Sequence, residues 1–132
     1  MSIDATQFHI YDVSHFPVCV YREDQAVPGF ASEWIKEMEL LIENQQPFVL
    51  VLNEVKTQES HDDYRDRGVW LKHNKDRLAQ YCKGMITIES DQERRAMAEK
   101  QGELAAKAFG LHHFAVATLD EAHQKVRELI PA

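Results

Sequence analysis

Hydrophobic residues form one uninterrupted run near the middle of the chain. Residues 48–52, Phe-Val-Leu-Val-Leu, lie between a polar turn at 44–47 and a mostly polar connector at 53–60. A continuous apolar run of this length is typical of a strand that is covered on both faces and flanked on both edges. The pattern therefore predicts that residues 47–53 form an interior strand of a sheet, with helices on both sides.

Two shorter strand patterns precede this run. Residues 7–11 alternate polar and apolar side chains, and residues 16–21 are more continuously apolar. With only residues 12–15 between them, they predict an antiparallel hairpin. Residues 28–43 then repeat apolar side chains at three- and four-residue intervals, which predicts a helix with one buried stripe and with charged residues, Glu37 among them, facing away.

The rest of the chain repeats a strand followed by a helix start. A hydroxyl residue with an acidic residue three positions later is a typical helix N-cap, and it occurs at Ser60, Ser90 and Thr118. The first of these helices is expected to reach residue 83 and to end at a left-handed Gly84. The second is expected to run toward Phe109 and to stop at Gly110.

Strands are expected after these two helices, at 85–88 and 113–117. Strands that alternate with helices predict right-handed crossovers and a parallel sheet, here with an antiparallel strand at one edge. With 132 residues, 44% of them hydrophobic, the chain has enough apolar side chains for one core. We therefore expect a single α/β domain over residues 1–132, with a mixed, mostly parallel sheet of about five strands and four helices.

The charge balance restricts the partners. Fifteen basic and twenty-two acidic residues give a net charge of −7, which repels the phosphates of nucleic acids. The first residues show no basic stretch followed by an apolar one, and no apolar run reaches the length of a membrane span. A cytoplasmic protein without membrane insertion is expected. Cys19 and Cys82 form no C-x-x-C pair, so two reduced, buried thiols are expected.

The expected helix from Ser60 and the residues that follow it contain a spaced set of residues: Trp70, Leu71, Asn74, Arg77, Leu78, Cys82 and Gly84. They are similar to the W-L-x-x-N-x-x-R-L-x-x-x-C-x-G signature of small bacterial proteins grouped as STAS/SEC14-like, over residues 69–88. The order of strands and helices over residues 16–130 also resembles the SpoIIAA-like order of STAS domains and SEC14-type lipid-binding relatives.

The resemblance implies a function and a modification site. In anti-sigma-factor antagonists of this superfold, a serine at the start of the helix after the central strand is phosphorylated, and Ser60 is the best match. The family's D-S-[ST]-G stands here as Glu59-Ser60-His61-Asp62. The resemblance thus implies a non-catalytic regulatory or protein-interaction domain with another protein as its partner. A homo-oligomer is compatible with it.

Polar residues on an apolar helix face are the candidate binding residues. At about 100° per residue, Arg67 and Asn74 share a face with Trp70 and several leucines. Either Arg67 faces the crevice and helps to bind an anionic ligand, or it pairs with Asp63 or Glu54 while Asn74 bonds a backbone carbonyl. Sheets of α/β proteins bind ligands at the carboxyl ends of their strands, so residues at that edge are candidates as well. The complete set of candidate binding residues is Asn53, Ser60, Arg67, Trp70 and Asn74.

The sequence carries no recognisable catalytic motif. Seven histidines form no H-E-x-x-H, and glycine-rich nucleotide loops and the G-x-S-x-G elbow are missing, so no metal and no cofactor are expected. Scattered residues such as His61, Asp62 and Glu89 leave an enzyme open. The alternative to an interaction domain is a protein or enzyme that binds a lipid or other apolar molecule between sheet and helices. An enclosed apolar cavity of at least ~300 Å³ would favour it.

Overall fold

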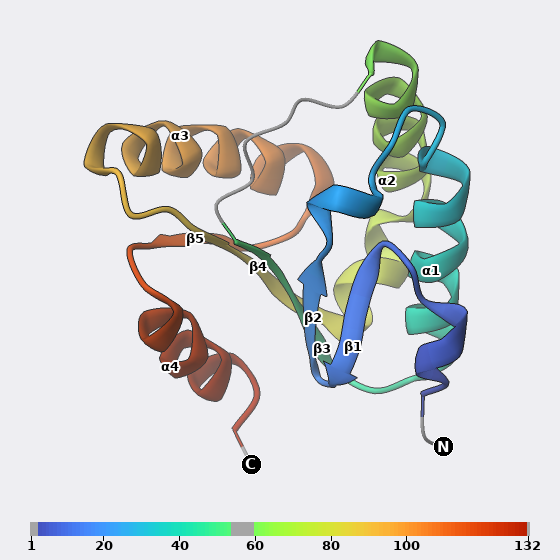
Figure 1. The fold of residues 1–132 in the computed structure, drawn as a ribbon, viewed down its shortest axis with the longest axis horizontal. Helices are drawn as coiled ribbons and strands as arrows, with labels where there is room; N and C mark the ends of the chain where they lie inside the picture. Colours follow the sequence, from blue (N-terminus) through green and yellow to red (C-terminus); the bar gives the residue numbers. More distant parts are fainter. Residues whose placement is uncertain (1–2, 54–59, 132) are drawn as a thin grey trace.

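Five strands form one sheet in the order β1-β2-β3-β4-β5 (Figure 1). The structure is a computed structural model, and it describes residues 3–53 and 60–131. It shows a single α/β domain. The strands are β1 (Tyr11–His15), β2 (Val18–Tyr21), β3 (Phe48–Asn53), β4 (Cys82–Ile88) and β5 (His113–Val116). The helices are α1 (Ala31–Glu43), α2 (His61–Tyr81), α3 (Gln92–Phe109) and α4 (Leu119–Leu129), with short 3₁₀ turns η1 (Ala5–Gln7) and η2 (Glu23–Gln25).

The apolar run forms the central strand, as predicted. β3 pairs in parallel with β2 on one edge and β4 on the other, while β1 and β2 form the antiparallel hairpin. Alternate side chains of β3 enter two separate cores. Phe48 and Leu50 belong to the core under α1 and α2, and Val49 and Val51 belong to the core under α4. All four are buried, which explains why the run contains no polar residue.

The helices divide unequally between the two faces of the sheet. α1 and α2 pack side by side on one face, and α3 packs against β5 and the end of α2 on that same face. α4 alone covers the other face, through Ala122 and Val126 (Figure 1). The first face therefore holds three helices, and the candidate site described below lies among them.

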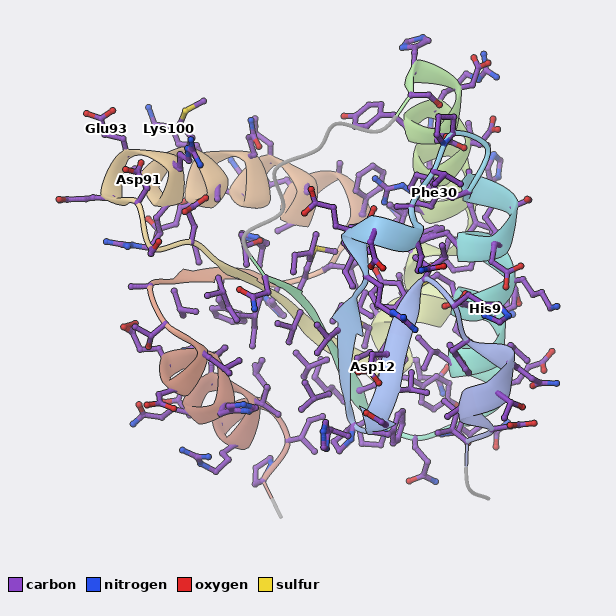
Figure 2. All side chains as sticks on the ribbon, viewed as in Figure 1. His9, Asp12, Phe30, Asp91, Glu93 and Lys100 are labelled. Carbon is purple, nitrogen blue, oxygen red and sulfur yellow. The ribbon has the colours of Figure 1, made fainter. Side chains whose placement is uncertain are left out.

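The first strand begins at Tyr11, so the prediction of a strand at residues 7–11 is wrong. The backbone N–H groups of His9, Ile10 and Tyr11 donate to the carboxylate of Glu37 at 2.9–3.1 Å, and not to a neighbouring strand at these positions. Figure 2 shows His9 beside α1, the helix that carries Glu37. Glu37 is fully buried, which corrects the expectation that it faces away. Its two side-chain oxygens therefore have three backbone donors as partners.

The end of α2 also differs from the prediction. The helix ends at Tyr81, and β4 begins directly at Cys82, so Gly84 lies inside a strand and not at a helix C-terminus. A Cβ atom at Gly84 would lie 3.1 Å from Leu129 of α4 and 3.3 Å from Phe114 of β5. This glycine therefore permits close packing. α3 ends at Gly110 as predicted, and this glycine has the left-handed conformation, with φ of 71°.

Two of the three predicted N-caps are confirmed. The hydroxyl of Ser60 accepts from the Asp63 N–H at 3.2 Å, and that of Thr118 accepts from the Glu121 N–H at 3.2 Å. At α3 the cap is Asp91, which accepts from the Arg94 N–H at 2.9 Å, and the prediction of Ser90 is wrong (Figure 2). Sequence spacing could not separate two adjacent residues that are both good caps.

Removing a cap should cost stability only where the structure places one. We expect Ser60→Ala, Asp91→Ala and Thr118→Ala each to lower the free energy of unfolding by about 0.5–2 kcal/mol. Ser90→Ala is the matched control and should cost less than Asp91→Ala, because Ser90 is exposed and Asp91 is the cap of α3. Urea unfolding of the four variants measures this. Equal losses for Ser90→Ala and Asp91→Ala would show that the start of α3 is misplaced.

Both cysteines are free and buried, as predicted. Burial raises the pKa of the Cys82 thiol to about 12, and burial raises the pKa of Cys19 as well. Because a thiol reacts as its thiolate, both side chains are chemically inert at neutral pH and act as small apolar residues in the core.

Candidate functional site

A large hollow opens between α2, α3 and the sheet. We call it the outer hollow. Its volume is about 610 Å³. Side chains come from the first half of α2, the second half of α3 and the adjoining strands β4 and β5. They are mostly aliphatic or aromatic: Tyr64, Arg67, Leu71, Met85, Gln101, Leu104, Ala105, Ala108, Phe109, Leu111 and His113.

A smaller hollow continues from it beneath α1. This inner hollow has a volume of about 220 Å³. It shares four lining residues with the outer hollow, and they mark the junction: Arg67, Leu71, Met85 and Leu111. Its other lining residues are Tyr11, Tyr21, Trp34, Leu50, Leu52 and Leu78. The outer hollow alone exceeds the size that pockets for small molecules require.

Arg67 is the charged residue at this junction. Its guanidinium carbon lies 5.1 Å from the ring centre of Trp34 and 5.8 Å from that of Phe30. Cation–π contacts of this kind hold a guanidinium group in a fixed position. Phe30 directly precedes α1 and lies beside α2 (Figure 2). Arg67 lines both hollows, and its charge also acts on Asp63, so both roles considered for Arg67 stay predictions. Glu54, one of its two predicted partners, lies outside the described residues.

The other predicted partner, Asp63, positions the start of α2. Its buried carboxylate accepts from the Ser60 hydroxyl at 2.6 Å and from the N–H groups of Gly29 and Ala31 at 2.8 and 3.0 Å. Burial by itself raises the pKa of Asp63, but these hydrogen bonds and the nearby charge of Arg67 together lower it below its ordinary value. Asp63 thus fixes the first turn of α2 against the start of α1, and thereby orients Arg67.

His113 contributes a second polar group to the outer hollow. Its Nε2 lies 2.8 Å from the hydroxyl oxygen of Thr87, and its buried Nδ1 has no hydrogen-bond partner among the described residues. Burial lowers the pKa of His113, and the charge of Glu99 opposes this only in part. The imidazole is therefore neutral at pH 7. The place of His113 in the wall of the outer hollow gave no signal in the sequence.

The signature residues of α2 form a contact between helices. Glu39 of α1 accepts from the indole N–H of Trp70 at 3.1 Å and from the guanidinium of Arg77 at 2.8 Å. Asn74 donates to the Trp70 carbonyl at 2.9 Å, as the structural alternative predicts, and its φ of −124° marks a kink in α2. Trp70 also packs edge-to-face on Trp34, with ring centres 5.5 Å apart. A ligand-binding role for Trp70 and Asn74 stays a prediction.

The predicted binding edge is assembled but lies apart from the hollows. Asn53 pairs with Ile88, and the Glu89 N–H donates to the Val116 carbonyl, so three strand ends lie side by side. Residues 54–59 of this edge lie outside the described residues. Asn53 and Ser60 line neither hollow. Phosphorylation of Ser60 stays a prediction, and it would break the bond between its hydroxyl and Asp63.

Other chemistry gains little support from the geometry. Within residues 3–53 and 60–131, no three His, Cys, Asp or Glu side chains lie close enough together to hold a metal ion. His61 and Asp62 are exposed on the first turn of α2, and buried Glu89 accepts from the Asp91 N–H at 3.1 Å. His61, Asp62 and Glu89 line neither hollow. None of the described helices has the length and apolar character to cross a membrane.

Comparisons with protein-family models, curated proteins and solved structures found no match. The STAS/SEC14-like resemblance and the SpoIIAA-like order therefore stay predictions, supported by the residues quoted for them. The function has to be inferred from the site itself.

Proposed function

We propose that this chain is a small-molecule-binding protein that holds a largely apolar ligand in the outer and inner hollows. The observation that carries the proposal is the outer hollow of about 610 Å³, whose walls are mostly aliphatic and aromatic. Ligand pockets typically have volumes of ~300–1,000 Å³ and apolar walls with a few convergent polar groups. Arg67, Tyr64, Gln101 and His113 supply such polar groups.

The packing of α3 supports the same function. A helix on a sheet normally buries an apolar stripe, but Gly102 is the single buried residue of α3, all of which is described. Leu104 of α3 is 69% exposed and Tyr64 of α2 is 67% exposed, and both line the outer hollow. A ligand between α2 and α3 would cover these side chains and supply the missing contacts, which gives apolar binding a driving force.

Filling the outer hollow with a side chain should prevent binding. We expect wild-type protein to bind the neutral apolar dye Nile red, with a rise in fluorescence. Ala105→Phe should weaken this binding at least about tenfold, because the ring would occupy the ligand's space. Ala96→Phe is the matched control. Ala96 precedes Ala105 by nine residues, which at about 100° per residue places it on the opposite side of the same helix.

Titration of the dye into the three proteins, with thermal unfolding as a check on folding, measures this effect. Two results would contradict the proposal. One is wild-type protein that does not bind Nile red. The other is equal binding by all three proteins, which would place the dye elsewhere.

The second candidate is a non-catalytic regulatory domain of STAS-like type that binds another protein or a second copy of itself. Exposed apolar side chains on α2 and α3 favour it, because such side chains often mark interaction surfaces: Tyr64, Val69, Met97 and Leu104. An interaction domain needs no small molecule in its hollows. The absence of Nile red binding by wild-type protein would therefore favour this candidate over the first.

A further inference from the structure

The outer edge of β5 is an open edge of the sheet. Among the described residues, β5 pairs with β4 alone. The carbonyls of His112 and Val116 accept from N–H groups in and directly after β4. Because backbone groups alternate between the two edges of a strand, the N–H and C=O groups of His113 and Ala115 point outward. β5 thus presents two donors and two acceptors to a further strand.

The opposite edge of the sheet is protected. β1 forms that edge, and its register with β2 shifts between Asp12 and His15. The Tyr11 N–H donates to Glu37, and the Ser14 N–H donates to the side chain of Asp12. An irregular register and N–H groups that already have acceptors hinder the addition of another strand. Of the two edges, β5 is therefore the one that can accept a further strand.

A groove with a volume of about 340 Å³ follows this open edge, and we call it the edge groove. Its floor is the whole of β5, His113–Val116. α3 and α4 lie on either side of β5 and form the walls (Figure 1). Glu99 and Glu103 line the α3 wall, and Lys125 lines the α4 wall.

The two walls differ in charge. Among the described residues, the carboxylates of Glu99 and Glu103 form no salt bridge. The Nζ of Lys125, in contrast, lies 2.9 Å from a carboxylate oxygen of Glu128 and 4.6 Å from the ring centre of Phe114. The α3 wall is therefore acidic, whereas the charge on the α4 wall is compensated and lies over an aromatic ring.

We infer that the edge groove binds an extended peptide segment of another protein, which pairs with β5 as an added strand and directs basic side chains at Glu99 and Glu103. Side chains alternate between the two faces of a strand, so those between the basic ones face α4 and Phe114, where apolar groups fit best. This interaction goes beyond the binding of a small molecule in the hollows and does not depend on it.

The spacing of the two glutamates matches a strand. Glu99 and Glu103 are four residues apart on α3, which corresponds to a rise of about 6 Å along the helix. Alternate residues of a strand are separated by about 6.5 Å. Because α3 runs alongside β5 (Figure 1), two basic side chains on one face of the added strand can each meet one carboxylate. This is the electrostatic complementarity that selects a partner.

A second copy of this chain fits the edge groove less well. Two β5 strands that pair antiparallel around a twofold axis keep the same face of both sheets on one side. Glu99 and Glu103 of one copy would then lie beside the same two residues of the other copy. Like charges in such positions repel each other, so a basic segment is the better partner.

Two labelled peptides of opposite charge test the inference, acetyl-Lys-Val-Lys-Val-Lys-amide and acetyl-Glu-Val-Glu-Val-Glu-amide. Fluorescence anisotropy with the full-length wild-type protein gives both affinities. We expect the lysine peptide to bind at least about tenfold more tightly. Glu99→Gln and Glu103→Gln should each weaken its binding about two- to fivefold. Glu93→Gln is the matched control, because Glu93 is exposed on the same helix and does not line the groove (Figure 2).

Methylation of the peptide's backbone nitrogens separates strand pairing from charge attraction. Successive N–H groups of a strand point to opposite edges, so methyl groups on the lysine nitrogens block one edge and those on the valine nitrogens block the other. Only one edge of the peptide faces β5. One methylated peptide should therefore lose at least about tenfold in affinity, and the other should lose less than about threefold.

Ala115→Pro should weaken binding of the lysine peptide at least about tenfold, because proline removes an outward N–H and keeps the pairing with β4. Thermal unfolding checks that this variant folds, and the methylated peptides decide the question if it does not. Four results would overturn the inference: no binding of the lysine peptide, equal binding of both charges, equal effects of both methylations, or unchanged binding by folded Ala115→Pro. Wild-type dimers that Ala115→Pro abolishes, measured by sedimentation, would also overturn it and assign the edge to a second copy.

Discussion

Replacing Glu37 with Gln is expected to destabilise the protein by about 2–4 kcal/mol, although the side chain changes by one atom. The carboxylate is fully buried and accepts from the N–H groups of His9, Ile10 and Tyr11. In Gln, one oxygen becomes an NH₂ group that faces these donors, so at least one buried N–H loses its acceptor. Burying a neutral amide costs less free energy than burying a carboxylate, but this difference offsets only part of the lost hydrogen bonding.

Glu43→Gln is the control, because Glu43 lies on the same helix and is exposed. It should change the free energy of unfolding by no more than ~0.5 kcal/mol. Urea unfolding of both variants at pH 7 measures the difference. If Glu37→Gln and Glu43→Gln lowered the free energy of unfolding equally, the backbone of residues 9–11 would not depend on the Glu37 carboxylate.

Gly102→Ala should also destabilise the protein, by about 1–3 kcal/mol. In an open helix position the same change would stabilise by up to ~1 kcal/mol, because Ala favours helical conformations. At Gly102 a Cβ atom would overlap the imidazole ring of His113, so α3 would have to move away from β5. The steric cost exceeds the helical gain.

Gly68→Ala provides the matched control. Gly68 lies inside α2, and a Cβ atom there would meet no other atom within 4 Å. This variant should be more stable than wild type by up to ~1 kcal/mol. Chemical denaturation of both glycine variants, and of Gly102→Ala in a His113→Ala background, measures the effect. Removing the imidazole by His113→Ala should remove much of the destabilisation caused by Gly102→Ala. A gain in stability for Gly102→Ala alone would show that α3 and β5 do not pack in this way.

The predictions that the sequence supported well depend on local patterns. The run at residues 48–52 identified the central strand, and capping residues located the starts of α2 and α4. The failures involve contacts between distant segments. Glu37 bonds backbone groups that precede it by 26–28 residues, and helical periodicity counted it as an outward-facing residue. Gly84 was assigned by the rule for helix ends, whereas its role depends on α4 and β5 packing above it.

The candidate site was predictable only in part. Arg67 was identified because a charged residue on an apolar helix face requires an explanation, and this face does line the hollows. The opposite wall was not predictable, because Leu104, Ala105 and Phe109 have the composition of ordinary core residues. Only the position of α3 relative to α2 leaves space between them. The sequence placed the site at the edge of the sheet, whereas the hollows lie on its face.

The most direct test of the proposed binding site is a crystal structure of the full chain grown with Nile red. We predict electron density for the dye between α2 and α3, in contact with Leu104 and Ala105. Density for the probe on another surface, or hollows filled by the protein's own side chains, would contradict it.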